Sequence, residues 1–423
     1  MRFTTLTDWL AWQQTLHPNA IDLGLERLNR TLQRLGWRRP ACPVITVAGT
    51  NGKGSSVALL NRILGEAGYR VGTFTSPHLL RYNERIMIAD REVSDASLIA
   101  AFERIDAVRG ADTLTYFEFN ALAALLVFET AGLDALVLEV GLGGRLDAAN
   151  AVDADVALIT SIDLDHCEWL GPDVESIGRE KAGIFRAGQT AIFGSGAMPA
   201  SIQSVADALG TKLLCHGRDY QVRRSGTRWS WQGVHGRLDD LPAPALVGDI
   251  QFDNAAAVLT VLEALAERLP VSRDAIERGL RKVQITGRFQ RIRRDHEWIL
   301  DVAHNPAAAR VLASQLATPA TKGRTIAVCG ILGDKDIEGI CRTLTSSIDV
   351  WIAAGLGSER SIRAADLGER LRQCGANVFA TTDNVSQACA TAASLAAAAD
   401  RIVVFGSFLT VAAALQWLEG EGG

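Results

Sequence analysis

The sequence predicts an α/β protein in which mostly parallel sheets are covered by helices. Short apolar runs alternate with helical patterns along most of the chain, which is typical of parallel strands joined by helical crossovers. At 423 residues the chain is long for a single domain, so two or three domains are expected. A second series of alternating strands and helices, beginning near residue 297, indicates a second α/β domain.

The composition is that of a globular protein with large cores, because 48% of the residues are hydrophobic and 22% are charged. With a net charge of −5 and no long basic run, no nucleic-acid partner is expected. The N-terminus lacks the basic start and apolar core of a secretory signal. The apolar region 121–142 contains three acidic residues, so no membrane span is expected. Seven dispersed cysteines without a C-x-x-C pair favour buried thiols in the cytoplasm over disulfides or a zinc site.

The first half of the chain alternates regularly between strand and helix patterns. A glycine loop follows the first apolar run, and Ser94 is a suitable cap for a later helix. The segment 117–132 is apolar nearly all round, which predicts a buried helix. The predicted strands are 43–49, 70–76, 134–141, 154–161 and 189–194, and the other predicted helices are 56–67, closed by Gly68, and 94–109.

The pattern changes near residue 212. Residues 219–241 alternate and are rich in turn residues, which predicts short antiparallel strands. Helices are predicted at 254–269 and 272–283, and the second α/β series occupies 297–306, 324–336, 349–355, 376–382 and 400–415. The charged, poorly periodic stretch 283–293 is the predicted boundary. It divides the chain into a first domain at 1–287 and a Rossmann-like α/β domain at 288–423.

The glycine loop reads VAGTNGKGSS over residues 47–56. It departs from the common G-x-x-x-x-G-K-[ST] pattern because Gly54 follows Lys53 and the hydroxyls come later. Between a strand and a helix, its backbone N–H groups would point at an anion, and Lys53 would add a positive charge. A tight turn with a solvated lysine is the less favoured interpretation. We therefore predict a domain of the P-loop ATPase fold, and the loop alone leaves open whether phosphate is transferred, hydrolysed or only sensed.

Polar side chains follow several predicted strands. Ser76, Glu139, Asp165 and His166 all stand at or after strand ends, where ligands gather in open α/β sheets. Hydroxyl and carboxylate oxygens beside a triphosphate suit Mg²⁺. Histidine is an unusual Mg²⁺ ligand, so His166 alone would more often be a hydrogen-bonding core residue. Glu139 is the stronger candidate, because a carboxylate at the end of an apolar strand needs a partner.

Three further segments carry weaker signals. The loop GLGGRLDAAN, 141–150, suits either a surface salt bridge or a substrate contact. Lys181 is expected, from the sequence pattern alone, on the solvated face of a helix. Asp301, His304 and the GDKD segment at 333–336 follow strands of the second series, but turn chemistry alone explains such residues.

Taken together, these segments resemble the Mur ligase superfamily, and within it the branch of bacterial dihydrofolate and folylpolyglutamate synthases. The resemblance spans nearly the whole chain, through IDLGLERL, VAGTNGKGSS, TSPHLLRYNERI, LTYFEFNALAAL, LEVGLGGRLDAAN, ITSIDLDHCEWLG, IGREKAGIFR, GRFQ, LDVAHNP, GDKD and VVFGSF. In this superfamily the loop reads T-N-G-K-[GT]-[ST]. The folate branch of this superfamily has glycine directly after the lysine, as at Gly54. Ser55 then supplies the hydroxyl group that the common pattern has next to the lysine.

The resemblance implies an ATP-dependent ligase. ATP would convert a free carboxylate to an acyl phosphate, and the amine of L-glutamate would displace the phosphate. The implied acceptors are dihydropteroate and tetrahydrofolate polyglutamates, and the implied cofactors are ATP and Mg²⁺ at two sites, with no K⁺ site defined by the sequence. A cytoplasmic monomer that binds small molecules is expected, with the glutamate subsite near Asp301 and His304.

The resemblance also assigns residues. It implies phosphate contacts by Thr50, Asn51, Gly52, Lys53, Gly54 and Ser55, and further ATP contacts by Asn254, Arg288 and Asp301. It implies the magnesium ligands Ser76, Glu139 and His166, and a carbamate on Lys181, which reverses the solvated-face interpretation. The implied pterin and aminobenzoate pocket consists of Asp22, Leu23, Gly24, Thr115, Tyr116, Phe117, Glu118, Leu146, Asp147 and Ala148. The catalytic candidates are Lys53, Lys181 and His166.

Three other functions compete with this one. A folylpolyglutamate synthase without the first activity would share most motifs, but TYFE and DLG favour the bifunctional form by resemblance. A P-loop nucleotide switch would need no second α/β domain with ATP contacts. A cell-wall Mur ligase acting on a UDP-linked sugar peptide shares the loop but not FEFNALAAL or GRLDAAN.

Overall fold

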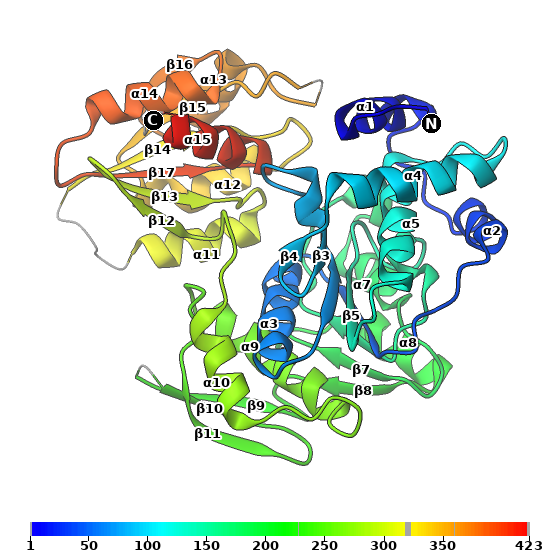
Figure 1. Cartoon of the computed structure of the whole chain (residues 1–423). Helices are drawn as coiled ribbons and strands as arrows, with labels where there is room; N and C mark the ends of the chain where they lie inside the picture. Colours follow the sequence, from blue (N-terminus) through cyan, green and yellow to red (C-terminus); the bar gives the residue numbers. More distant parts are fainter. Residues whose placement is uncertain (1, 227, 318–322, 359, 421–423) are drawn as a thin grey trace. The chain divides into compact units, whose positions relative to one another are not determined.

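The computed structural model describes residues 2–226, 228–317, 323–358 and 360–420 (Figure 1). The chain forms two compact units. The first unit comprises Met1–His78, Tyr82–Ala245 and Asp249–Val283, and the second comprises Leu79–Arg81, Leu246–Gly248 and Gln284–Gly423.

The described residues of the first unit form an eight-stranded sheet. Its strands are β1 (Val44–Ala48), β2 (Val71–Phe74), β3 (Ile86–Ile88), β4 (Arg91–Glu92), β5 (Ala135–Glu139), β6 (Val156–Ile159), β7 (Thr190–Phe193) and β8 (Lys212–Cys215). The order is β4-β3-β2-β5-β1-β6-β7-β8, parallel from β2 to β8, with β3 and β4 antiparallel. The central strands β1 and β5 are buried along their whole length, as expected for parallel strands covered on both faces.

Apart from this sheet, the first unit consists mainly of helices. They are α1 (Leu6–Leu16), α2 (Glu26–Leu35), α3 (Lys53–Glu66), α4 (Asp95–Arg109), α5 (Tyr116–Glu129), α6 (Cys167–Leu170), α7 (Val174–Ala182), α8 (Ala200–Leu209), α9 (Ile250–Ala264) and α10 (Arg273–Lys282). Helix α3 contacts β1, β2 and β5, whereas α9 contacts β6 and β7. Helix α5 is buried nearly all round, and Thr115 and Glu118 close its N-terminus as a capping box. Ser94 caps α4, as the sequence predicts.

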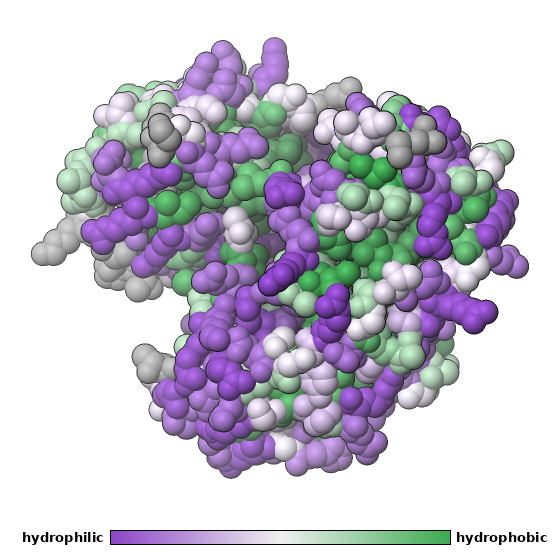
Figure 2. Space-filling model, in the orientation of Figure 1, coloured by the Kyte–Doolittle hydropathy of each residue, from purple (hydrophilic) through white to green (hydrophobic). Residues whose placement is uncertain are grey.

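A small antiparallel sheet lies in the 219–241 region, where short strands are expected. It consists of β9 (Gln221–Ser225), β10 (Arg228–Gln232) and β11 (Arg237–Pro242). Trp229 and Trp231 of β10 are buried on one face, and the residues between and around them are more exposed. Hydrophilic colouring dominates Figure 2 around this sheet and α10. One side of this sheet therefore faces the core and the other faces solvent.

The described residues of the second unit form a six-stranded sheet. Its strands are β12 (Gln290–Arg293), β13 (Glu297–Asp301), β14 (Thr325–Cys329), β15 (Val350–Ala354), β16 (Val378–Thr382) and β17 (Arg401–Phe405). The order is β12-β13-β17-β14-β15-β16, and only the β12–β13 pair among these described strands is antiparallel. The covering helices are α11 (Pro306–Leu316), α12 (Ile337–Leu344), α13 (Ala364–Gln373), α14 (Val385–Leu395) and α15 (Phe408–Gly420).

The structure corrects several expected bounds. Helix α3 begins at Lys53, three residues before the expected start, because Gly52 adopts a left-handed conformation at its cap. Helix α9 spans Ile250–Ala264, so the expected range 254–269 starts and ends too late. The stretch 283–293 is not wholly irregular, since it contains β12, whose alternating exposed arginines hide the strand pattern. No described helix has the length and apolar character needed to cross a membrane.

Candidate active site

The glycine loop connects the buried strand β1 to helix α3. Gly49 has φ +144°, and a Cβ there would lie 1.9 Å from the Thr160 hydroxyl oxygen. Gly52 has φ +89°, and a Cβ there would lie 2.7 Å from Oδ1 of Asn254. Both positions therefore require glycine for conformation and for space. The tight turn brings the N-terminus of α3 directly behind the loop. The backbone N–H groups at a helix N-terminus are suited to bind an anion.

The loop is fixed to the end of β6. Thr50 N–H donates to the carbonyl of Ser161, and the Thr50 hydroxyl exchanges hydrogen bonds of 3.1 Å with the backbone of Asp163. The Thr160 hydroxyl donates to the carbonyl of Asn51 at 2.6 Å. These bonds set the loop conformation before any ligand binds. Asn254, on α9, approaches the same loop at Gly52, and its contact with ATP stays a prediction.

Two lysines converge on one carbonyl of the loop. Lys53 Nζ donates to the carbonyl oxygens of Gly49 at 3.0 Å and Thr50 at 3.3 Å. Lys181 Nζ donates to the same Gly49 oxygen at 3.1 Å. The pKa of Lys181 is lowered to about 7, mainly by burial and next by the positive charge of Lys53, against opposing effects of Asp165 and Asp147.

The solvated-face interpretation of Lys181 is wrong. Its side chain is buried, with 5% of the residue exposed, although it belongs to the polar helix α7. The C-terminal end of α7 lies against the loop 141–150, where the Arg145 N–H donates to the carbonyl of Glu180, and Lys181 extends from there to Gly49. The helix pattern gave no sign of this. An amine that is partly neutral near pH 7 is a nucleophile, which an ordinary exposed lysine is not.

The predicted metal ligands follow three strands. Glu139 ends β5, and its Oε2 accepts a hydrogen bond of 3.1 Å from the backbone N–H of Ser76, which follows the adjacent strand β2. Glu139 also pairs with Val47 in β1, and its Oε1 lies 4.0 Å from where a Cβ of Gly54 would be. The buried carboxylate therefore borders the phosphate loop. His166 follows β6 with φ +52°, and Cys167 begins α6 after it.

These residues fit a magnesium ion. The described residues contain no cluster of three or more His, Cys, Asp and Glu side chains suited to a metal. The predicted set instead combines one carboxylate, one hydroxyl and one imidazole. Mg²⁺ usually binds one or two protein carboxylates and completes its shell with phosphate oxygens and water. A buried carboxylate beside a phosphate loop matches that requirement.

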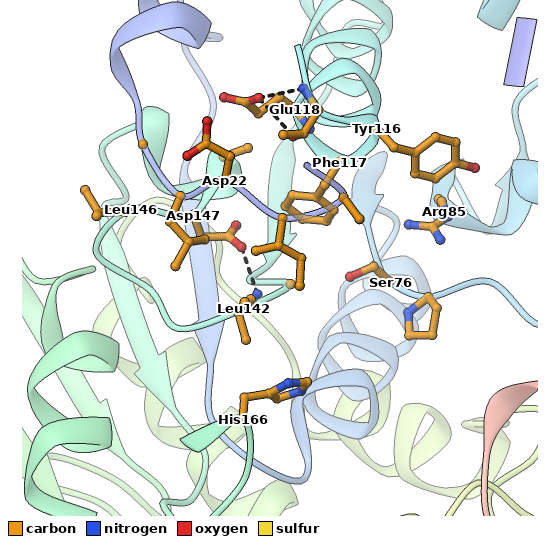
Figure 3. A pocket seen from close by; sticks show the side chains of 18 residues that line it. Asp22, Ser76, Arg85, Tyr116, Phe117, Glu118, Leu142, Leu146, Asp147 and His166 are labelled. Carbon is orange, nitrogen blue, oxygen red and sulfur yellow. Dashed lines mark hydrogen bonds between the residues drawn. The ribbon is translucent and has the colours of Figure 1, made fainter. Parts of the chain in front are cut away.

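The predicted ring pocket is one cavity of about 270 Å³ (Figure 3). All ten of its predicted residues line it, together with Ser76 and His166. The other lining residues are Ala20, Ile21, Pro77, Arg85, Gly141 and Leu142. A mostly apolar cavity with a few convergent polar groups is the usual form of a small-molecule site. The cavity therefore reaches from the ring pocket to two of the predicted metal ligands.

The GLGGRLDAAN loop forms the expected salt bridge and also lines a cavity, while its contact with substrate stays a prediction. Arg145 forms an exposed ion pair with Glu180 at 2.9 Å, which is the structural alternative. Asp147 is buried and lines the cavity, and it accepts from the backbone N–H groups of Leu142 at 2.8 Å and Ala149 at 2.9 Å. Burial raises the pKa of Asp147 to about 6, although these hydrogen bonds act in the opposite direction.

An ion network supports the acidic end of the cavity. Arg27, on α2, donates from Nε to Oε2 of Glu118 at 2.7 Å, and its Nη1 pairs with Asp22. The same Glu118 oxygen accepts from the backbone and hydroxyl of Thr115. Oε1 of Glu118 is buried and has no hydrogen-bond partner in the described protein. A buried unpaired carboxylate oxygen at a cavity wall is suited to accept from the N–H groups of a ligand.

Sequence reasoning missed Arg85. This residue ends a short 3₁₀ helix, Tyr82–Arg85, directly before the apolar strand β3, and it lines the cavity. The available signal was a charged residue at the start of an apolar run in the segment NERI.

The other predicted residues lie in the second unit. Asp301 ends β13 and is buried, and its carboxylate accepts from the backbone N–H groups of Phe289 and Ala303, each at 2.8 Å. Burial raises its pKa, which Arg288 and these hydrogen bonds oppose. The Arg288 guanidinium lies 5.7 Å from the Phe408 ring centroid, and His304 also contacts Phe408. The structure thus groups Arg288, Asp301 and His304 within that unit, and their contacts with ATP or glutamate stay predictions.

Comparisons with known proteins match both units. Residues 47–194 match the Mur ligase middle domain, and residues 287–408 match the Mur ligase glutamate ligase domain. The Escherichia coli K12 protein named dihydrofolate synthase/folylpolyglutamate synthase is 44% identical over 98% of this chain and 96% of its own length.

Two solved structures are similar over almost the whole chain. One is E. coli FolC in complex with DHPP and ADP, with a TM-score of 0.94, 44% identity and coverage of 99% of both chains. The other is a bifunctional folylpolyglutamate synthase/dihydrofolate synthase with Mn, AMPPNP and L-glutamate bound. Its TM-score is 0.90, its identity 45%, and the match covers 98% of both chains.

Proposed function

The chain belongs to the Mur ligase family, in its dihydrofolate synthase/folylpolyglutamate synthase branch, and on that premise we propose how its own residues carry out the ligation. The protein is an ATP-dependent ligase of folate metabolism that adds L-glutamate to dihydropteroate and to folylpolyglutamates. The observation that carries this proposal is the single cavity that joins the ring-pocket residues to Ser76 and His166.

ATP and a divalent cation are the cofactors of this reaction, as the ligands of the related structures indicate. We assign the cation as Mg²⁺, at two sites, with Ser76, Glu139 and His166 as protein ligands. The oxygen-rich donor set supports this choice. Bound there, the cation would neutralise charge on the phosphates and on the acceptor carboxylate.

The chain's own groups then position the reactants. The loop residues 50–55 hold the phosphates through backbone N–H groups, and Lys53 neutralises the charge that develops at the outer phosphate. The terminal phosphoryl group moves to a carboxylate oxygen of the acceptor, which gives an acyl phosphate and ADP. The amine of L-glutamate attacks the acyl carbon, phosphate leaves with the C–O bonding electrons, and the amine loses a proton. Much of the rate acceleration comes from holding ATP, the acceptor carboxylate and the amine of L-glutamate in the reactive orientation.

Lys181 is proposed to carry a carbamate. Its amine adds to CO₂, forms an N–C bond and loses one proton, which converts a cation to a carboxylate-like group. The lowered pKa of about 7 supports this reaction, because the neutral amine is the reactive form. Next to Lys53, the carbamate would also replace a repulsive contact with an attractive one.

The ring pocket is proposed to hold the pterin and aminobenzoate groups. The Phe117 ring offers a flat apolar surface, and Leu142 adds an aliphatic contact (Figure 3). Acceptors for the N–H groups at the pterin edge are the carboxylates of Asp22, Glu118 and Asp147. The pairing of Asp22 and Glu118 with Arg27 holds both carboxylates in position. The buried, unpaired Oε1 of Glu118 supports its assignment as one such acceptor.

Three wider assignments complete the proposal. We assign ATP binding to residues 1–287 and glutamate ligation to residues 288–423, with Asn254 on the first side and Arg288 and Asp301 on the second. We also propose that the protein is a monomer. None of the seven cysteines, all of which lie among the described residues, forms a disulfide, which supports work in the reducing cytoplasm.

Release of ADP by the purified protein tests the function. ADP should appear only when ATP, L-glutamate and either dihydropteroate or a tetrahydrofolate are all present. Equal ATP turnover without acceptor and glutamate would favour the nucleotide switch. Activity with tetrahydrofolate but not dihydropteroate would indicate the monofunctional synthase, and activity restricted to a UDP-linked peptide would indicate the cell-wall ligase.

A further inference from the structure

Arg85 is a buried cation of the cavity that the assignments above leave without a role. Only 8% of the residue is exposed, and its side chain lines the cavity. Figure 3 shows the guanidinium beside Ser76 and below Tyr116. The guanidinium therefore lies at the end of the cavity where the predicted metal ligand Ser76 lies. The carboxylates of Asp22, Glu118 and Asp147 lie at the other end (Figure 3).

The contacts of Arg85 leave most of its donors unused. Nε donates to Nδ1 of His78 at 2.7 Å. The guanidinium carbon lies 5.7 Å from the Tyr116 ring centroid and 5.9 Å from that of Tyr82. Within the part of the chain that the structure describes, the two Nη groups make no hydrogen bond and Arg85 forms no ion pair. Four N–H donors are therefore available to the cavity.

Comparison with Arg27 shows why this is unusual. Arg27 is also largely buried, but it is paired with the carboxylates of both Asp22 and Glu118. Removing a guanidinium from water without a counter-charge is costly, and contacts with two rings recover only part of that cost. A planar guanidinium can bind a carboxylate through two parallel hydrogen bonds. The geometry of Arg85 therefore suits an anion that enters the cavity.

The distribution of charge in the cavity identifies the anion. Asp22, Glu118 and Asp147 lie at one end, Phe117 lies between, and Arg85 lies at the other end with Ser76 (Figure 3). A complementary ligand has a flat ring with N–H donors at one end and a carboxylate at the other. Dihydropteroate has this polarity, and its single carboxylate is the group that reacts.

We propose that Arg85 binds the carboxylate of the acceptor and makes the cavity select an ionised acid over a neutral analogue of the same shape. The proposal rests on the proposed function, because it takes dihydropteroate as the acceptor. It deepens that function by assigning Arg85 to hold the reacting group on the Ser76 side of the cavity.

Equilibrium binding of two ligands without ATP tests this assignment. The ligands are dihydropteroate and its carboxamide, which has the same shape but no charge. The wild-type protein should bind the acid about 10- to 100-fold more tightly than the amide, the range for charge-assisted hydrogen bonds. Arg85→Gln should bind the acid and the amide about equally. Arg85→Lys should keep part of the preference for the acid, because lysine keeps the positive charge but lacks the paired N–H groups of the guanidinium.

Arg27→Gln is the matched control. It removes a guanidinium at the other end of the cavity, so it should weaken acid and amide by the same factor and keep their ratio. Arg85→Gln should melt within a few degrees of the wild-type protein, since no carboxylate partner in the described protein is lost.

The other outcomes contradict the proposal. An Arg85→Gln variant that weakens both ligands equally, keeps the preference for the acid or does not fold would give Arg85 a structural role. If Arg85→Gln changes only the binding of a nonhydrolysable ATP analogue, the guanidinium serves phosphate instead. A wild-type protein that binds neither ligand would overturn the proposed function itself, and with it this assignment.

Discussion

Lys53 and Lys181 donate hydrogen bonds to the same carbonyl oxygen, that of Gly49, at 3.0 and 3.1 Å. Two ammonium groups on one oxygen repel each other, and burial adds to the cost of charging Lys181. The site therefore places the charge of Lys53 beside an amine, that of Lys181, whose pKa is lowered to about 7. This difference underlies the separate roles proposed for the two lysines.

Replacing Lys181 tests the carbamate. Lys181→Ala should abolish ligation, because the carboxylate-like group is lost. Added acetate or propionate should restore part of the rate by occupying the space beside Lys53. The measurement is ADP release against carboxylate concentration. Lys212→Ala, at an exposed position of β8, is the control and should keep full activity without added acid. The absence of any rescue would count against the carbamate and would leave the ligase assignment intact.

The pH dependence of stability tests the burial of Lys181. Its pKa is about 7 in the folded protein and 10.5 in its ordinary state, so the unfolded chain binds the extra proton more tightly. The free energy of unfolding should therefore rise as pH increases from about 7 towards 10.5, by on the order of 5 kcal/mol in total. In Lys181→Met this rise should disappear.

Denaturant unfolding at pH 6 and pH 9 in CO₂-free buffer measures this effect. At pH 6 the methionine variant should be the more stable protein, because it buries no charge. Parallel pH profiles for the two proteins would show that Lys181 titrates normally.

Glu139 should control the need for the divalent cation. Glu139→Gln keeps the size of the side chain but removes the charge that borders Ser76 and the loop. We expect the rate to fall by about 10²-fold, the scale of removing one electrostatic group from an active site. Titration of ADP release with Mg²⁺ should show a higher concentration at half-saturation. An unchanged titration would remove Glu139 from the metal site.

Gly49 should tolerate no side chain. Gly49→Ala forces a Cβ into the Thr160 hydroxyl and a strained φ, so it should destabilise the first unit by at least about 1–3 kcal/mol and abolish ATP binding. Gly196→Ala is the control, since a Cβ there meets nothing within 4 Å. Thermal unfolding and nucleotide binding check both variants. Equal behaviour of the two alanine variants would contradict the geometry of the loop.

Features encoded by neighbouring residues could be predicted from the sequence. The loop around Lys53 follows from a strand, glycines and a helix in direct succession, and Glu139 stands out as a carboxylate at the end of an apolar strand. The burial of Lys181 depends on Gly49, 132 positions earlier, so no local pattern shows it. Arg85 was missed for the same reason, because the cavity beside it is formed by distant segments. Strand β12 was hidden by its exposed arginines.

Transfer of oxygen from the acceptor to phosphate tests the central claim most directly. Dihydropteroate labelled with ¹⁸O in its carboxylate would be ligated to L-glutamate, and the released phosphate would be analysed by mass spectrometry. Activation through an acyl phosphate predicts one ¹⁸O atom in the phosphate for each amide formed. Unlabelled phosphate released alongside the amide product would contradict this account, because the carboxylate oxygen would then have left by another route.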